Sequence, residues 1–134
     1  MAKPQPRTGA TTERASRARS GETLEQCVTR SLQQYFEDVL RAAGADPVPY
    51  AYKLRCCGAA LMVTNRRAAV QMVRDLLQNA VDSGAEVIAT ACPLCQTNLE
   101  CYQAEVNHAY DADYAMPILY FTQLLGVALG VGVK

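Results

Sequence analysis

The chain of 134 residues contains no tryptophan and only one histidine, and its formal net charge at pH 7 is zero. A neutral balance of this kind gives no electrostatic guide to a partner. No apolar run approaches the roughly 18 residues that a membrane-spanning helix needs. The most apolar stretch, residues 118–133, is interrupted by Thr122, Gln123 and three glycines, so we interpret it as core and expect no membrane span. Phosphate-binding loops, Ser/His/Asp sets and paired-carboxylate sites are also missing, which argues against those classes of enzyme.

The first 26 residues have little apolar content, and Met1 to Ser20 contains no apolar segment of a secretory signal. This stretch is rich in Arg, Ser and Thr, a composition that fits a transit peptide, a basic arm for nucleic acid, or a disordered tail. We predict that residues 1–26 form a disordered or poorly ordered tail, and we expect no nucleic-acid partner. Without an export signal we expect a cytoplasmic protein, in which six cysteines indicate metal or redox chemistry rather than disulfides.

The remainder, residues 27–134, alternates between helical and strand patterns. Apolar residues at helical spacing predict helices over residues 32–43, 66–82, 93 onward and 121–129. Alternating or short buried runs predict strands over residues 47–52, 86–91 and 116–121. Strands that alternate with helices in this way predict an α/β fold with a small, mainly parallel sheet and flanking helices. At this length the segment forms one domain.

Four of the six cysteines occur in two tight pairs, Cys56-Cys57 and Cys92-x-x-Cys95. Each pair follows a predicted strand and precedes a predicted helix, and the carboxyl ends of parallel strands share one edge of a sheet. Helix N-termini favour thiolates, and Pro93 suits the first position of a helix capped by Cys92. The sequence therefore predicts a metal site at the carboxyl ends of the strands.

Spacing alone leaves the identity of the metal open. A Cys-x-x-Cys pair is common to zinc sites, iron–sulfur sites and dithiol redox motifs. Two adjacent cysteines have diverging side chains, which a cluster of several irons accepts more readily than a single zinc ion. In a further alternative all four simply fill core space, because free cysteine is often buried.

Two segments carry a specific resemblance. KLRCCGAA at residues 53–60 and ACPLCQTNL at residues 91–99 resemble the signature of the cysteine-rich (CCG) domain, and the form Cys-Pro-Leu-Cys-Gln is most similar to that of the B-type subunits of heterodisulfide reductase. The flanking residues 39–45 and 65–79 fit as well. The resemblance corresponds to the C-terminal domain of such a heterodisulfide reductase protein only, whereas the family carries two such domains.

The resemblance implies a 4Fe–4S cluster of an unusual, non-cubane form held by five cysteines of one domain. Cys56, Cys57, Cys92 and Cys95 match the motif as ligands. Cys27 is the one upstream cysteine and hence the candidate for the fifth ligand. The sequence departs from the family here, because no apolar strand precedes Cys27; without this ligand a four-cysteine cubane or a degenerate site would result.

The predicted function is therefore that of an iron–sulfur redox subunit that carries electrons to a disulfide or sulfur substrate within a larger complex. By the same resemblance, its partners would supply flavin and ferredoxin-type iron–sulfur clusters. The alternatives are a zinc-binding structural or interaction module, a degenerate relative without catalysis, and a dithiol oxidoreductase that uses Cys92 and Cys95. We interpret Cys101 as a core or surface residue and His108 as a surface residue, not as ligands.

Overall fold

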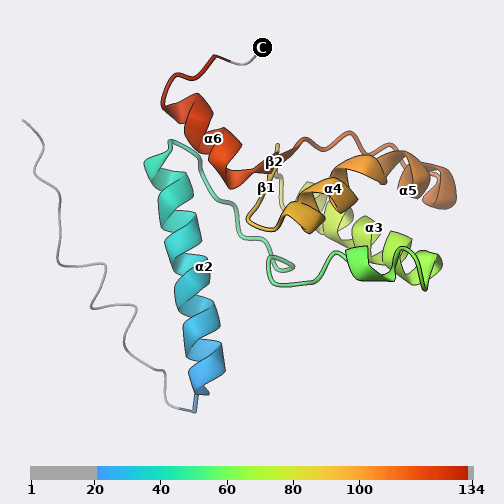
Figure 1. Cartoon of the computed structure of the whole chain (residues 1–134), viewed down its shortest axis with the longest axis horizontal. Helices are drawn as coiled ribbons and strands as arrows, with labels where there is room; N and C mark the ends of the chain where they lie inside the picture. The colour runs from blue at the N-terminus through green and yellow to red at the C-terminus, as the bar shows by residue number, and fades with distance from the viewer. Residues whose placement is uncertain (1–20, 133–134) are drawn as a thin grey trace, which may run out of the picture.

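The computed structural model describes residues 21–132 and shows helices packed around two short strands (Figure 1). In chain order the elements are α2 (Leu24–Ala42), the 3-10 helix η1 (Ala59–Leu61), α3 (Arg66–Asp82), β1 (Ile88–Thr90), α4 (Pro93–Cys101), α5 (Gln103–Tyr110), β2 (Ile118–Tyr120) and α6 (Phe121–Ala128). The two strands form a parallel pair in which Ile88 lies beside Ile118 and Thr90 beside Tyr120. Helices α4 and α5 make the connection between them. The fold is thus α/β with a small parallel sheet, as the sequence predicts.

Helix α3 forms one side of the hydrophobic core. Asn65 caps its first turn by accepting a hydrogen bond from the N–H of Ala68. One face of the helix is buried, through Ala69, Val70, Val73, Leu76, Leu77 and Ala80. These side chains pack against Leu99 of α4, Val106 of α5 and Ile118 of β2. The helical spacing of apolar residues therefore places α3 against the sheet and the two connecting helices.

Residues 47–52 do not form the strand that their alternating pattern predicts. The backbone N–H of Tyr52 donates to the Asn79 side chain, and the Tyr50 hydroxyl donates to the carbonyl of Leu76. Pro47 and Pro49 have no N–H to offer to a neighbouring strand. The two tyrosines therefore alternate because both contact α3, and residues 47–52 form an irregular segment that crosses this helix.

Helix α2 begins earlier than the predicted residue 32. Thr23 and Gln26 form a reciprocal capping box that starts the helix at Leu24. The predicted tail therefore overlaps the start of this helix, while residues 1–20 lie outside the described part of the chain. The division into a tail and one domain stays a prediction.

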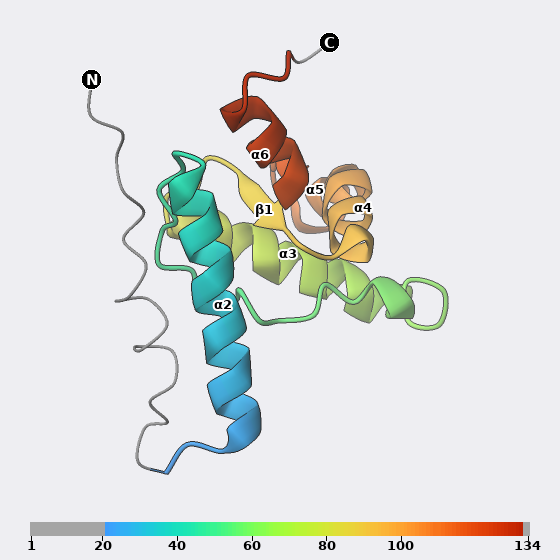
Figure 2. The same cartoon turned by 60° about the vertical axis from the view of Figure 1, so that its left-hand side comes forward.

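Figures 1 and 2 show that the first turns of α2 project away from the rest of the fold, and that its last turns approach α6. Phe36 contacts Phe121 edge to face, with ring centroids 5.9 Å apart. Large apolar side chains on another face of α2 are exposed to solvent, namely Leu24, Val28, Leu32, Tyr35 and Val39. We call these five residues the α2 stripe. Within residues 21–132, none of the helices combines the length and apolar character needed to cross a membrane.

Candidate functional site

The loop Cys56-Cys57-Gly58 leads into η1 rather than following a strand. Gly58 has φ +76°, in the left-handed region, and this turn sends the two cysteine side chains into different surroundings. Cys56 is exposed, and its sulfur accepts a hydrogen bond from the N–H of Gly58 at 3.4 Å. Cys57 is only 2% exposed and belongs to the hydrophobic core. The expectation that both cysteine pairs follow strands is thus wrong for this pair, because residues 47–52 are irregular.

The second pair lies where the sequence predicts it. Strand β1 ends at Thr90, Cys92 is the N-cap of α4, and Pro93 is the first helical residue. The hydroxyl of Tyr120, on the neighbouring strand, donates to the carbonyl of Ala91 at 3.0 Å and ties β2 to this turn. Cys92 is exposed and Cys95, one turn along, is half-buried.

The Cys95 thiol lies near two of the other three thiols of the motifs. The thiols of Cys57 and Cys92 are both close enough to Cys95 to raise its pKa. Burial, and then these two neighbouring sulfurs, raise the pKa of Cys95 to about 12. The pKa of Cys92 is lowered, first by the backbone N–H of Cys95, and also by the Cys95 thiol and the N–H of Leu94. The start of α4 therefore stabilises a thiolate at its N-cap, as a helix N-terminus should.

A buried amide connects the two cysteine segments. Asn98 is 2% exposed, and its side-chain N–H₂ donates to the carbonyl of Cys57 at 2.8 Å. Asn98 lies three residues after Cys95 and so on the same side of α4. Sequence reasoning did not single out Asn98, although a polar residue one helical turn from a candidate ligand was a usable signal.

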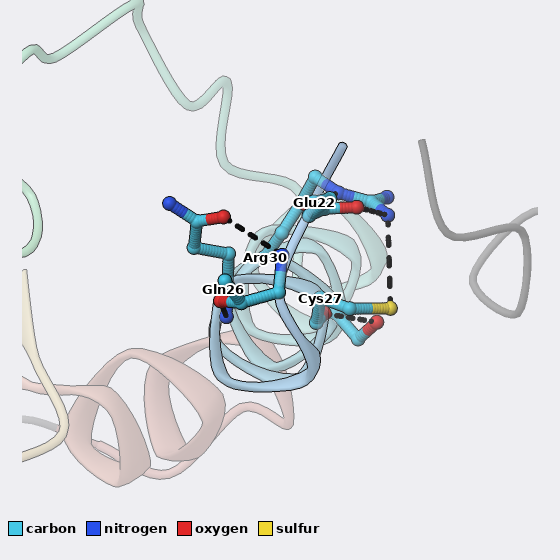
Figure 3. Close-up of polar contacts among 6 residues, drawn as sticks. Glu22, Gln26, Cys27 and Arg30 are labelled. Atoms are coloured by element: carbon cyan, nitrogen blue, oxygen red, sulfur yellow. Dashed lines mark hydrogen bonds and ion pairs between the residues drawn. The ribbon is translucent and has the colours of Figure 1, made fainter. Parts of the chain in front are cut away.

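Cys27 lies apart from these residues, in the first turn of α2 (Figure 3). Its sulfur accepts a long hydrogen bond of 3.9 Å from Arg30 Nη2, and that guanidinium also pairs with Glu22 at 2.9 Å. Because the first turns of α2 project away from α3 and α4, the structure does not bring Cys27 to the other candidate ligands.

The two weaker candidates are peripheral. Cys101 is exposed at the end of α4, and His108 is exposed in α5. Among residues 21–132, no three His, Cys, Asp or Glu side chains lie close enough together to hold one metal ion. The structure therefore places the Cys95 thiol near those of Cys57 and Cys92, with Cys56 next to Cys57 in sequence, without showing a metal group.

Comparison with known proteins agrees with the cysteine motifs. The cysteine-rich domain named CCG matches residues 22–100. The B-type component of the ferredoxin:CoB-CoM heterodisulfide reductase of Methanosarcina mazei is 36% identical over 98 residues, which cover 72% of this chain and 33% of that protein. The corresponding component of the ferredoxin/F(420)H(2)-dependent CoB-CoM heterodisulfide reductase of Methanosarcina acetivorans is 37% identical over 98 residues, with the same coverage.

A component of a second kind of reductase is similar to the same extent. The membrane anchor subunit of 8-methylmenaquinol:fumarate reductase of Wolinella succinogenes is 34% identical over 99 residues, which cover 74% of this chain and 35% of that protein. The chain thus spans about a third of the length of the curated relatives it matches. With more than half of its residues matched and both cysteine pairs inside the match, the chain belongs to the cysteine-rich (CCG) domain family.

Proposed function

We propose that the chain is an iron–sulfur redox subunit of a multi-subunit reductase, and that it passes electrons toward a disulfide or sulfur substrate. The observation that carries the proposal is the proximity of the Cys95 thiol, in the first turn of α4, to those of Cys57 and Cys92, with Cys56 next to Cys57 in sequence. The named relatives of similar sequence are components of reductases, which supports the same class of function.

The donor set fits an iron–sulfur cluster. Iron is held by thiolates, and the N–H groups of Cys95 and Leu94 already favour the thiolate of Cys92. Cys56, Cys57, Cys92 and Cys95 would be the ligands of a 4Fe–4S cluster. When bound, such a cluster supplies reversible one-electron transfer. The non-cubane form would require Cys27 as well, and the first turn of α2 would have to approach α4 for that fifth bond.

The protein itself orients and shields the ligands. Asn98 fixes the carbonyl of Cys57 against α4, and the Tyr120 hydroxyl fixes the turn that precedes Cys92. Cys57 is buried among core side chains, so water is excluded from one side of the ligand set. Exposed Cys92 and Cys56 leave the other side open, which is where an electron donor or a substrate would approach.

The proposed partners are the other proteins of such a complex, which would carry flavin and ferredoxin-type clusters. The α2 stripe supports this part of the proposal, because contiguous exposed apolar side chains commonly mark a protein interface. The cytoplasmic location that the sequence suggests stays a prediction.

A dithiol oxidoreductase is the second candidate, and one observation favours it. An exposed Cys92 with a lowered pKa beside a half-buried Cys95 with a raised pKa is the arrangement of an attacking and a resolving thiol. That chemistry makes no use of Cys57 as a ligand, so the two functions can be separated by experiment.

The test is to purify the chain without oxygen and to measure iron and acid-labile sulfide per chain. We expect about four irons with matching sulfide, as a 4Fe–4S cluster requires. Zinc in place of iron would favour a structural module, and the absence of both metals after reconstitution would contradict the proposal.

Variants then assign the ligands. Cys57→Ala keeps an apolar side chain in the core and removes the thiolate, so it should lose iron while retaining the fold. Cys101→Ser is the matched control, because this exposed cysteine is not a proposed ligand, and it should retain iron. Full iron in Cys57→Ala would contradict the ligand assignment. Cys27→Ser separates four from five ligands through the electron paramagnetic resonance spectrum of the oxidised cluster.

A further inference from the structure

Thr90 is the last residue of β1 and stands two positions before Cys92. It is 8% exposed, and within residues 21–132 its hydroxyl oxygen has no hydrogen-bond partner. A buried hydroxyl without a partner costs free energy comparable to a lost hydrogen bond, so a folded chain keeps few of them. Thr90 therefore calls for an explanation, and none is supplied by the groups of the described part of the chain.

The alternation of the strand places Thr90 on the side of the sheet that faces the hydrophobic core. Side chains alternate along a strand, so Thr90 shares a face with Ile88. Ile88 packs against the hydrophobic core that contains Cys57, and the half-buried Cys95 packs against the same core. Helix α4, which carries Cys95, contacts both β1 and β2. The unpartnered hydroxyl is thus at the carboxyl end of β1, on the core side, at the turn that leads to Cys92.

The residue type is informative as well. Valine has nearly the same shape as threonine and would fill this buried position without an unsatisfied oxygen. In the metal-free chain the hydroxyl lowers stability slightly, and it forms a favourable hydrogen bond only when an acceptor is present. Thiolate and sulfide sulfurs are acceptors that an iron–sulfur centre would bring to this end of the sheet.

We propose that the Thr90 hydroxyl donates a hydrogen bond to sulfur of the iron–sulfur centre and thereby raises its reduction potential. The inference rests on the proposed function and goes beyond it, because it assigns a tuning role to a residue that is not a ligand. Reduction adds negative charge to the sulfurs, so a hydrogen-bond donor stabilises the reduced form more than the oxidised form. Removal of the donor therefore lowers the potential.

The experiment compares Thr90→Val with Thr90→Ser in the full chain. Valine keeps the shape and removes the hydroxyl, whereas serine keeps the hydroxyl and removes a methyl group. We expect Thr90→Val to change the ratio of reduced to oxidised cluster at a fixed potential by about tenfold, a shift of about 59 mV for one electron, toward lower potential. Thr90→Ser should keep the potential of the unmodified chain.

The stability of the metal-free chain should rank the two variants in the opposite order to their reduction potentials. Thr90→Val should unfold at the same or a higher denaturant concentration than the unmodified chain, because it loses an unsatisfied hydroxyl. Thr90→Ser should unfold at a lower concentration, because it loses buried apolar surface. A residue with a merely structural role would not separate the two measurements in this way.

Three results would overturn the inference. If Thr90→Val destabilises the metal-free chain more than Thr90→Ser does, the hydroxyl already has a structural partner. If Thr90→Val loads iron and keeps the potential of the unmodified chain, the hydroxyl does not reach the sulfurs. If the unmodified chain binds no iron at all, the proposed function fails, and the inference fails with it; iron content thus separates that case from the first two.

Discussion

Alanine at Gly58 tests whether the Cys56-Cys57 loop is held in one conformation by the fold. Gly58 has φ +76°, and a left-handed conformation costs an L-residue with a side chain about 1–2 kcal/mol. A Cβ atom here would also lie 2.9 Å from Met72 Sδ and 3.3 Å from the Cα of Ala69. The methionine side chain can move aside, but the Ala69 backbone belongs to α3. Crowding should therefore add about 1–3 kcal/mol, the usual cost of overpacking.

Gly84 provides the matched control. Its φ is +73°, nearly the same as that of Gly58, and a Cβ atom there would meet nothing within 4 Å. Gly84→Ala should cost only the conformational strain of about 1–2 kcal/mol. The difference in unfolding free energy between Gly58→Ala and Gly84→Ala, measured by denaturant titration of the metal-free chain, isolates the crowding.

The functional consequence should differ in the same direction. Because Gly58 adjoins Cys57, a shift of the loop away from α3 moves a proposed ligand, so Gly58→Ala should bind less iron per chain. Gly84→Ala, at the far end of α3, should bind as much iron as the unmodified chain. Equal destabilisation by the two substitutions together with equal iron would refute the view that α3 fixes the cysteine loop.

Four further predictions concern the second cysteine segment and the exposed helix. Asn98→Ala should lower the free energy of unfolding by about 1–3 kcal/mol, because the buried carbonyl of Cys57 loses its donor. Gln96→Ala is the control: its hydrogen bond is exposed, so it should change the free energy of unfolding by less than about 1 kcal/mol. Equal effects of the two variants in denaturant titrations would contradict this prediction. Leu32→Glu should change the unfolding free energy by no more than about 0.5 kcal/mol, because Leu32 is 64% exposed. The same substitution should weaken co-purification with partner proteins of the complex. Unchanged co-purification would exclude the α2 stripe from the interface. In the metal-free chain, alkylation followed by mass spectrometry should modify Cys92 at lower pH than Cys95, because the N–H of Cys95 lowers the pKa of Cys92 and burial raises that of Cys95 to about 12. The raised pKa of Cys95 also predicts that the free energy of unfolding falls as pH rises above 9.0 toward about 12, because the thiol ionises at a lower pH in the unfolded chain than in the folded chain. Identical alkylation profiles for Cys92 and Cys95 would contradict the first of these two predictions. A constant free energy of unfolding over that pH range would contradict the second.

The sequence is sufficient to predict α3 and the start of α4, whose signals are local. The apolar spacing of residues 66–82 predicts α3 with the bounds that the structure has, and Pro93 after Cys92 predicts the start of α4. The strand over residues 47–52 was predicted wrongly from an equally local alternation, because Tyr50 and Tyr52 alternate for contacts with α3 and not for pairing with a strand. A period of two reports which side chains are buried, but the partner that buries them is set by the tertiary fold.

The residues of the candidate site were likewise only partly predictable from the sequence. Motif spacing indicates the four cysteines, and the structure places the Cys95 thiol near those of Cys57 and Cys92. The spacing of Asn98 from Cys95 marks it as a polar residue near a candidate ligand, but neither its partner nor the role of Thr90 follows from the sequence, because both depend on the tertiary fold. Asn98 donates to a carbonyl 41 residues earlier in the chain, and Thr90 is distinguished only by being buried without a partner.

The position of Cys57 connects the stability of the fold to the chemistry of the site. Cys57 is among the largest fully buried side chains, together with Leu77 and Val73, so a proposed ligand is also a core residue. Any ligand that binds the folded chain and not the unfolded chain stabilises the fold. A cluster bound through Cys57 would therefore stabilise the contact between the cysteine loop and α3, and its loss would remove that added stability. The exposed Cys56 and Cys92 have no such connection to the core, so their replacement should remove iron with a smaller cost to the metal-free fold than replacement of Cys57 by a polar residue.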